Sequence, residues 1–423
     1  MRILLLGSGG REHTFAWKLS QSPQCEALFI APGNAGTGQH GTNISLNPND
    51  FPAVKAAALE HQINMVICGP EEPLVRGLQD FFAADEQLRE ILFVGPSQEG
   101  ARLEGSKAFA KAFMEELDIP TAAYREFTID HLEDGLKYLE EQQPPIVLKA
   151  DGLAAGKGVL ILDDVREAEE EFRAMLEGKF GDASATVVVE EFLSGIEFSV
   201  FVFTDGKDYK LLPVAKDYKR IGEGDTGLNT GGMGSVSHPP FVDAAMMQKV
   251  DERIIRPTIE GLQRREMDYR GAIFFGLISV DDDPFVIEYN CRMGDPETQS
   301  VFPRLKSDLV ELCRATAMGE VASVEVELEE QSVASVILVS GGYPGSYEKG
   351  KAIAGLDQVE GSLIFHAGTK LGEDGALLTN GGRVLAITSY ADTFQEAVAK
   401  SLANAEKVSF EGAYFRRDIG FDL

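Results

Sequence analysis

The sequence predicts a protein of mixed α/β and α+β class with several domains, and three observations lead to this fold class. The first is length, since 423 residues exceed what one hydrophobic core usually serves. The second is the alternation of short apolar runs with amphipathic stretches in the first hundred residues, which is typical of a parallel sheet covered by helices. The third is the pairing of strand-like runs around short turns in the middle of the chain, which indicates antiparallel sheet.

The N-terminal domain is expected to be Rossmann-like, with a parallel sheet, and to span residues 1–102. Its strand-like apolar runs lie at residues 3–6, 28–31, 65–68 and 91–94. Three of these runs end in loops that contain glycine, at residues 7–10, 32–37 and 69–71. Since ligands bind beyond the carboxyl ends of parallel strands, we expect one crevice to collect the three loops.

The central region, residues 103–325, is expected to combine helices with antiparallel sheet. A helix-rich stretch at residues 97–117 leads into it. Strand-like runs follow at residues 146–150, 159–162, 186–192, 198–203, 272–280 and 285–290. Turn residues separate two pairs of runs, so hairpins are expected at Asp205 with Gly206 and at residues 281–284.

The remaining part, residues 326–423, is expected to form a small C-terminal mixed domain. A helix is predicted at residues 305–318, and the acidic residues 325–330 mark the boundary after it. The elements expected beyond that boundary are strands at residues 332–340, 363–365 and 384–390 and an amphipathic helix from Phe394 to about Ala405.

The composition is globular and strongly acidic. The chain has 39 Lys and Arg against 68 Asp and Glu, a formal net charge of −29. Such a chain has no general attraction to nucleic acid or to an anionic membrane, and no apolar run approaches the length of a membrane span. Residues 3–6 are too short an apolar run for a signal peptide, so we expect a cytoplasmic protein. No feature of the sequence sets the oligomeric state, and a monomer is compatible with it.

The four cysteines are interpreted as free thiols in a reducing compartment. They form no CxxC pair and no spacing typical of a zinc site, because they are widely scattered: Cys25, Cys68, Cys291 and Cys313.

A glycine motif at residues 7–13 follows the first strand and opens a helix. Backbone amides and the helix dipole make such a turn an anion site, although a plain tight turn is an equal alternative. The third glycine of a dinucleotide fingerprint is absent, since position 12 is Glu12, and a nicotinamide cofactor is therefore weakly supported. His13 is expected to pack at the helix start and not to act as a base.

A second glycine motif, at residues 149–158, indicates a phosphate-binding loop. Its glycines free the backbone to fold over a phosphate, and Lys149 and Lys157 bring positive charge. The alternative is a hairpin loop with incidental lysines. The spacing is not that of a P-loop, because Gly158 follows Lys157 where a hydroxyl residue would be needed.

The strand at residues 285–290 carries the candidate metal ligands. Alternation along a strand places Glu288, Asn290 and Arg292 on one face, with Ile287 and Tyr289 on the other. A carboxylate and an amide oxygen are hard ligands that suit Mg²⁺, and an arginine beside them could hold a transferring phosphoryl group. The alternative is an exposed polar strand face. Two further carboxylates follow in a turn: Asp295 and Glu297.

Two more loops are candidates for ligand contacts. Residues 190–197 place acids at a strand end before a glycine turn, which can read adenine and ribose, although a solvated acidic turn explains them equally well. Residues 222–234 are rich in glycine and follow the charged residues 216–220, which suits a flap over an anionic substrate. The alternative there is a disordered surface loop.

Taken together, these motifs resemble the phosphoribosylamine–glycine ligase family, whose members are ATP-grasp enzymes of purine biosynthesis. The resemblance extends over essentially the whole chain. It rests on residues 7–13, 32–37, 69–71, 103–107, 149–158, 190–193, 225–234, 288–298, 304–308, 366–370 and 379–383. It implies an ATP-grasp fold for residues 103–325, with a lid subdomain at about residues 120–192.

The resemblance implies that ATP, glycine and 5-phosphoribosylamine give glycinamide ribonucleotide, ADP and phosphate. The glycine carboxylate attacks the γ-phosphoryl group to form glycyl phosphate, from which the amine of the second substrate displaces phosphate. Mg²⁺ or Mn²⁺ is the implied cofactor, held by Glu288 and Asn290. The implied partners are these small molecules, with no nucleic acid and no membrane.

The resemblance also implies roles for individual residues. Catalytic roles fall to Lys149, Asp217 and Arg292. The nucleotide is expected to contact Lys107, Lys149, Gly152, Gly156, Lys157, Gly158, Glu190, Glu191, Phe192, Leu193 and Glu197. The other two substrates are expected to contact Gly9, Gly10, Asn34, Glu71, Asp217, Lys219, Arg292, Asp295 and Glu297.

Two departures from the family pattern matter. Relatives usually carry Gln-Asp-His-Lys-Arg where this chain has residues 216–220, and Tyr218 cannot titrate near neutrality as histidine does. Many ATP-grasp enzymes also place a carboxylate on the preceding strand, which residues 274–278 lack. We therefore expect two protein ligands for each metal ion.

Two alternative functions remain open at this point. One is a different ATP-grasp ligase that acts on formate, bicarbonate or another small acid, which would share Lys149, Glu288 and Asn290 but would not need Asn34 or Asp295. The other is a nucleotide-sensing or dinucleotide-binding regulator built on the first domain. Phosphate release that requires both glycine and phosphoribosylamine would distinguish the reaction implied by the resemblance from both alternatives.

Overall fold

The computed structural model describes residues 1–153 and 158–423. Its N-terminal part is a parallel five-stranded sheet with strand order β3-β2-β1-β4-β5. The strands are β1 (Arg2–Gly7), β2 (Ala27–Pro32), β3 (Thr42–Asn43), β4 (Met65–Cys68) and β5 (Leu92–Val94). The helices of this part are α1 (Gly10–Leu19), α2 (Phe51–Glu60), α3 (Glu71–Val75) and α4 (Leu78–Ala84). The predicted parallel sheet is confirmed, and β3 is an additional short edge strand.

The three glycine loops of this sheet lie together, as expected. β1 is flanked by β2 and β4, so the loops after these strands leave the same edge. Glu12 joins two of them, because its Oε2 accepts a hydrogen bond from the Gly9 backbone N–H at 2.6 Å while its carboxylate packs against Gly69. A Cβ atom at Gly69 would overlap the Glu12 carboxylate. Glycine is required at this position because the loop and the side chain approach so closely.

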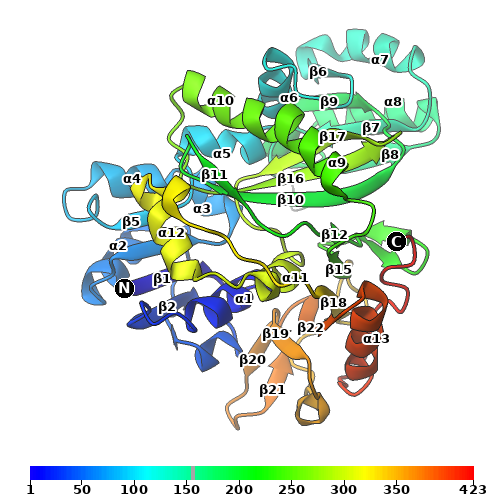
Figure 1. The fold of residues 1–423 in the computed structure, drawn as a ribbon. Coiled ribbons are helices and arrows are strands. Elements are labelled where there is room, and N and C mark those ends of the chain that lie inside the picture. Colours follow the sequence, from blue (N-terminus) through cyan, green and yellow to red (C-terminus); the bar gives the residue numbers. More distant parts are fainter. Residues whose placement is uncertain (154–157) are drawn as a thin grey trace.

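The central part contains a four-stranded antiparallel sheet with order β11-β10-β16-β17 (Figure 1). Its strands are β10 (Ile196–Thr204), β11 (Tyr209–Leu211), β16 (Gly271–Val280) and β17 (Asp283–Asn290). Helices of this part are α5 (Gln98–Gly105), α6 (Lys107–Glu116), α9 (Ala244–Val250), α10 (Arg256–Arg264), α11 (Thr298–Val301) and α12 (Leu309–Met318).

A second antiparallel sheet, β6-β9-β7-β8, stands apart from the rest at the upper right of Figure 1. Its strands are β6 (Tyr124–Thr128), β7 (Ile146–Ala150), β8 (Val159–Leu162) and β9 (Thr186–Glu191), with helices α7 (Leu132–Glu140) and α8 (Val165–Leu176). It has a hydrophobic core of its own, to which Phe127, Leu148 and Phe172 belong. This sheet lies within the segment predicted to be a lid, and its action as a lid stays a prediction.

The C-terminal part is built on a five-stranded sheet with order β12-β15-β18-β22-β19. Its strands are β12 (Lys216–Asp217), β15 (Gly234–Ser237), β18 (Ser332–Val339), β19 (Leu363–His366) and β22 (Arg383–Ala391), and α13 (Phe394–Ala405) packs on it. Two small hairpins flank this sheet: β13 (Arg220–Gly222) with β14 (Thr226–Asn229), and β20 (Thr369–Leu371) with β21 (Leu377–Thr379). The sheet crosses the boundary predicted at residue 325, since β12 and β15 come from the central region.

Three local expectations were wrong. The helix predicted from residue 305 begins at Leu309, because the Asp308 side chain caps it by accepting hydrogen bonds from the N–H groups of Val310 and Glu311. The turn expected over residues 281–284 is only two residues long, since β17 begins at Asp283. Strict alternation also fails at residue 287, where a register shift lets Val286 and Tyr289 enter the same core.

Within residues 1–153 and 158–423, no helix has both the length and the apolar composition needed to cross a lipid bilayer.

Candidate active site

The end of β17 carries the pair of side chains predicted to bind metal. The register shift before Glu288 leaves Ile287 as the extra residue, and its carbonyl accepts a hydrogen bond from Lys149 Nζ at 3.3 Å. Asn290 is buried at the end of the strand, and its Nδ2 has no hydrogen-bond partner. Within the described parts of the chain, the Glu288 carboxylate also makes no hydrogen bond and no ion pair. Both side chains are therefore uncommitted.

The Glu288 carboxylate lies in a field of positive charge. Burial alone would raise its pKa, but Lys219, Lys149, Lys107 and Arg292 together hold the pKa of Glu288 below its ordinary value. The same burial lowers the pKa of Lys107, which Glu288 partly opposes. Glu288 is thus ionised at neutral pH and available to a cation.

A buried ion cluster fixes Lys149. Its Nζ lies 2.9 Å from Glu190 Oε2, and Lys111 Nζ lies 3.2 Å from the same oxygen. All three side chains are buried, and Glu190 Oε1 has no hydrogen-bond partner. Burial lowers the pKa of Lys111 to about 8, even though Glu190 opposes the shift. Lys111 was missed by the sequence analysis, and its only signal was a lysine on the inward face of an amphipathic helix.

Lys107 stands at the start of α6, opposite the phosphate-loop candidate. The Asp151 side chain accepts hydrogen bonds from Ser106 Oγ at 2.9 Å and from the Ala108 N–H at 2.8 Å, which holds this helix start to the end of β7. Lys107 Nζ lies 3.4 Å from the carbonyl oxygen of Gly152. At the other end of the loop, the carbonyl of Gly158 accepts from the Ala150 N–H at 2.7 Å. The predicted residues Gly156 and Lys157 lie outside the described residues.

Arg292 is held by two carboxylates. Its Nη2 lies 2.8 Å from Glu104 Oε1, and its Nε lies 3.4 Å from Glu71 Oε2. Glu104 also accepts hydrogen bonds from the N–H and Sγ of Cys291. Burial works to lower the pKa of Arg292, but Glu104 and Glu71 raise it above its ordinary value. The sequence predicts no role for Glu104, although it lies in the motif at residues 103–107, because nothing in the sequence places residue 104 beside residue 292.

Three more carboxylates gather around Lys219. Glu197 Oε2 lies 2.7 Å from Lys219 Nζ, and this lysine lowers the pKa of Glu197. Asp217 and Glu297 are buried and close enough to influence each other. Burial, and after it the charge of Glu197, raises the pKa of Asp217, whereas burial and the charge of Asp217 raise the pKa of Glu297 to about 8.

A cavity of about 290 Å³ opens beside the glycine loops of the N-terminal sheet. Among the described residues that line it, Arg383 is the one cation. Arg383 Nη1 lies 3.3 Å from Asp295 Oδ1, and Asp295 also accepts from Gln299 Nε2 at 2.7 Å. The lining residues are Ser8, Gly9, Gly33, Asn34, Asp295, Ala367, Gly368, Thr369, Asn380 and Arg383.

Two residues predicted to contact substrate have other contacts in this cavity region. The Asn34 side chain donates from Nδ2 to the carbonyls of Ser8 at 2.9 Å and His366 at 2.8 Å, and its Oδ1 accepts from the Gly36 N–H at 2.8 Å. Asn34 therefore links the first domain to the C-terminal part. Gly10 packs against Gln299 and does not line the cavity.

Two residues predicted to contact the nucleotide, Glu191 and Phe192, are exposed. Phe192 is 40% exposed, and the Glu191 carboxylate accepts a hydrogen bond from the Ala123 N–H at 2.9 Å. Both lie at the end of β9, together with Leu193. They border the same strand end as Glu190, so a nucleotide held by Lys149 would reach them.

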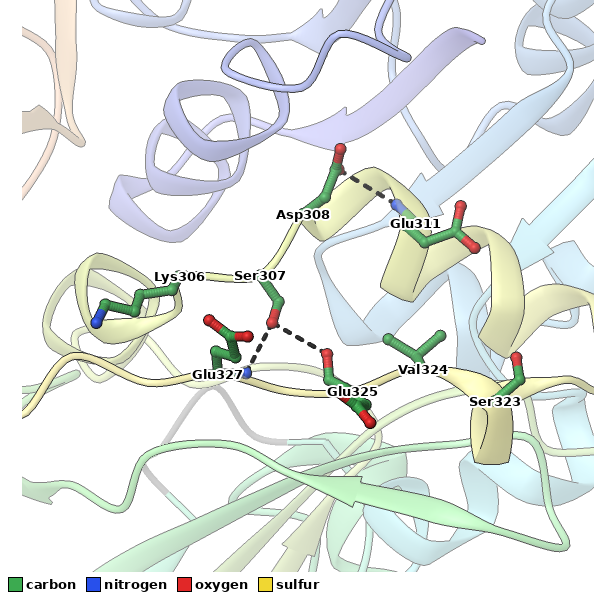
Figure 2. Close-up of a pocket in the computed structure, with 8 residues that line it drawn as sticks. All are labelled: Lys306, Ser307, Asp308, Glu311, Ser323, Val324, Glu325 and Glu327. Carbon is green, nitrogen blue, oxygen red and sulfur yellow. Dashed lines mark hydrogen bonds between the residues drawn. The ribbon is translucent and has the colours of Figure 1, made fainter.

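A larger groove of about 420 Å³ lies elsewhere and contains none of the predicted site residues (Figure 2). Its lining carries four carboxylates and a single lysine: Lys306, Ser307, Asp308, Glu311, Ser323, Val324, Glu325 and Glu327. Such a surface repels phosphates. Within the described parts of the chain, no group of three or more His, Cys, Asp or Glu side chains is arranged to hold a metal ion.

Known protein families match this chain in three consecutive domains. Residues 1–104 match the N domain of phosphoribosylglycinamide synthetase, residues 105–298 its ATP-grasp (A) domain and residues 333–422 its C domain. Curated relatives named phosphoribosylamine–glycine ligase from Pasteurella multocida and Vibrio cholerae are each 45% identical, over 100% of this chain and 98% of theirs.

Solved structures show the same relationship. A crystal structure of phosphoribosylamine–glycine ligase from Thermotoga maritima has 36% sequence identity and a TM-score of 0.84, covering 99% of this chain and 100% of that one. A biotin carboxylase from Campylobacter jejuni has 15% identity and a TM-score of 0.72, covering 97% and 92%, which shows a shared fold alone. By domain order, by full-length identity and by structure, the chain belongs to the phosphoribosylglycinamide synthetase family.

Proposed function

We propose that this protein is an ATP-dependent ligase that joins glycine to 5-phosphoribosylamine and gives glycinamide ribonucleotide, ADP and phosphate. The observation that carries the proposal is the uncommitted pair Glu288 and Asn290 facing Lys107, Lys149 and Lys219. Full-length relatives with this activity in their names support it. The proposed pathway is de novo purine biosynthesis.

The ATP phosphates are assigned to the lysine-rich region between the two central sheets. Lys149 and Lys107 approach it from the ends of β7 and α6, and the Gly152 and Gly158 backbone borders it. Positive groups placed there offset the charge of the phosphates and of the phosphoryl group during transfer. The adenosine contacts are assigned to Glu190, Glu191, Phe192, Leu193 and Glu197.

Glu288 and Asn290 would hold Mg²⁺ or Mn²⁺. Their donor set fits such an ion, because an ionised carboxylate and an amide are hard oxygen ligands and neither is committed elsewhere in the described chain. A bound divalent ion supplies charge neutralisation at the phosphate oxygens. A pair of protein ligands leaves most of the coordination to phosphate and water.

The glycine carboxylate is proposed to attack the γ-phosphorus, with ADP as the leaving group. Arg292 would orient the phosphoryl group, and Lys219 would attract the carboxylate. The amine of phosphoribosylamine then attacks the acyl carbon of glycyl phosphate, the bond to phosphate breaks, and the amine loses a proton. Asp217 and Glu297 have raised pKa values because both are buried, which suits them to take that proton.

The sugar phosphate is assigned to the 290 Å³ cavity. Gly9, which belongs to the first glycine loop, lines this cavity, and Arg383 brings the positive charge that a phosphate needs. Asp295 lines this cavity and pairs with Arg383, whereas Glu71 pairs with Arg292. Asn34 would act by shaping the cavity wall, and Gly10 by leaving room for Gln299, which donates a hydrogen bond to Asp295.

The experiment that tests this proposal measures phosphate release from ATP and Mg²⁺. Release that requires both glycine and phosphoribosylamine is expected. Release with glycine replaced by formate or bicarbonate would favour a different ATP-grasp ligase. Tight ATP binding without turnover would favour a nucleotide sensor. Product mass fixes which amine is consumed.

The remaining assignments are also proposals. We place the domain boundaries near residues 102 and 325, with the lid at about residues 120–192. We assign the protein to the cytoplasm and take the monomer as its working state.

A further inference from the structure

Residues 216–219, which begin with the short strand β12, have a second face away from the proposed substrate site. Lys219 pairs with Glu197, and Asp217 lies close to Lys219. Alternate residues of the same segment, Lys216 and Tyr218, contact the part of the chain at residues 414–422. The 414–422 segment thus lies directly behind two residues of the proposed site.

Asp422 joins these two side chains. Tyr218 donates its hydroxyl hydrogen bond to Asp422 Oδ1 at 2.9 Å, and Lys216 Nζ lies 3.1 Å from Asp422 Oδ2. Lys216 Nζ also lies 4.4 Å from the centre of the Tyr218 ring. Tyr218 is 1% exposed, so its hydroxyl depends on Asp422 for a partner. The pair fixes the Tyr218 side chain in one position.

Arg416 extends the same contact along the chain. Its side chain is fully buried, although it is charged, and its guanidinium lies 5.4 Å from the centre of the Tyr218 ring. It donates to the Arg220 carbonyl at 3.1 Å and pairs with Asp225 at 2.7 Å. Asp418 accepts from the Gly224 N–H at 2.6 Å. Arg416 and Asp418 therefore hold residues 220–225 through backbone groups of that stretch as well as through the Asp225 side chain.

We propose that Asp422, through Tyr218 and Lys216, is a positioning residue that sets where Asp217 and Lys219 stand in the glycine site. The inference rests on the proposed function. Since Asp217 and Tyr218 are consecutive residues of a short strand edge, a shift of the Tyr218 side chain moves the neighbouring carboxylate. The start of the glycine-rich stretch expected to act as a flap, up to residue 225, is on this account held in place by the 414–422 segment.

The test compares Tyr218→Phe, Asp422→Ala and the double variant, with kcat and KM measured for each substrate. Each single variant is expected to lower kcat/KM for glycine about tenfold, since small misplacements of positioning groups are costly. The KM for ATP should change less than twofold. The double variant should lose no more than Asp422→Ala alone, because Asp422→Ala already removes the hydrogen bond that Tyr218→Phe breaks. Matched controls are Tyr138→Phe and Asp357→Ala, neither of which alters the 414–422 contact.

A purely structural role predicts a different pattern. It would lower the melting temperature and reduce kcat equally for all substrates with unchanged KM values, and that result overturns the inference. Additive losses in the double variant, or wild-type kinetics in all three, overturn it as well. A wild-type protein that releases no phosphate would count against the proposed function alone. In that case, hydrogen exchange still decides: faster exchange at residues 216–222 in Tyr218→Phe supports the inference, and unchanged exchange overturns it.

Discussion

Glu104 Oε1 lies 2.8 Å from Nη2 of Arg292, while Oε2 of the same carboxylate accepts a hydrogen bond from the Cys291 N–H at 2.8 Å. A single side chain on α5 thereby fixes both the guanidinium and the backbone that follows β17. Glu71 adds a second, longer contact to Arg292. The orientation of Arg292 toward the proposed phosphoryl site is therefore set from the N-terminal half of the chain.

Glu104→Gln is expected to lower kcat about tenfold, because the neutral amide keeps the hydrogen bond to Cys291 but loses the ion pair that orients Arg292. Glu104→Leu leaves a buried charge short of one partner and is expected to cost about 3–5 kcal/mol of unfolding free energy. Urea denaturation and steady-state kinetics measure the two effects. Glu99→Gln, on the exposed side of the same helix, is the control, and equal losses in both positions would contradict this role.

Glu288→Gln is expected to reduce turnover by roughly two to three orders of magnitude with an unchanged fold, since one group that stabilises transition-state charge is removed. Phosphate release at saturating Mg²⁺ measures the loss, and circular dichroism checks the fold. Asp283→Asn lies on the same strand but at its exposed end, and should keep full activity. Normal turnover in the Glu288 variant would argue against this carboxylate as a metal ligand.

Arg383→Met is expected to raise the KM for phosphoribosylamine about tenfold to a hundredfold, the range that corresponds to a lost hydrogen bond to a charged group. The KM for ATP should stay unchanged, because Arg383 lines the cavity beside the glycine loops and pairs there with Asp295. Arg383→Lys should recover part of the loss. Arg89→Met, at an exposed position, serves as the control. A rise in the ATP KM alone would move the sugar phosphate to another site.

Because His366 is buried, we expect the free energy of unfolding to fall in mild acid. Burial lowers its pKa to about 4, from 6.5 when unfolded, and the neighbouring His13 has its pKa lowered in the same way. The unfolded chain therefore binds more protons than the folded chain below pH 6.5, so stability is complete above that pH and falls as the pH drops toward 4. For His366 alone the loss is about 1.4 kcal/mol at pH 5.5.

The measurement is urea denaturation of wild type and His366→Gln at pH 8 and pH 5.5. The variant should lose less stability than wild type between the two pH values. His131→Gln, at an exposed position, should behave like wild type. Identical pH dependence in the His366 variant would show that other groups cause the acid sensitivity.

Much of the fold was readable from local sequence. The apolar runs of the first domain, the strand at residues 146–150 and the helix from Phe394 to Ala405 all lie where the pattern placed them. Residues that share one short motif, such as Glu288 and Asn290, lie together on one strand as expected, and their role as metal ligands stays a prediction. Their charge environment follows from lysines that the motifs contained.

The rest depended on contacts between distant residues. Lys111, Glu104 and Asp422 acquire their roles only when another segment is folded against them, and single-sequence patterns carry no signal for such pairs. The bulge at Ile287 could not be predicted for a different reason, because a register shift depends on the partner strand. Local periodicity predicts elements, whereas the site is assembled from several elements.

The sheet that runs from β12 to β19 has a practical consequence for dissecting this protein. β18 takes one neighbour, β15, from residues 234–237 and the other, β22, from residues 383–391. A gene cut at residue 326 would leave β18 with a bare row of amide and carbonyl groups, an edge that recruits other chains into aggregates. The two pieces made separately should be insoluble or should aggregate, and co-expression of both pieces should be needed to recover them as a complex.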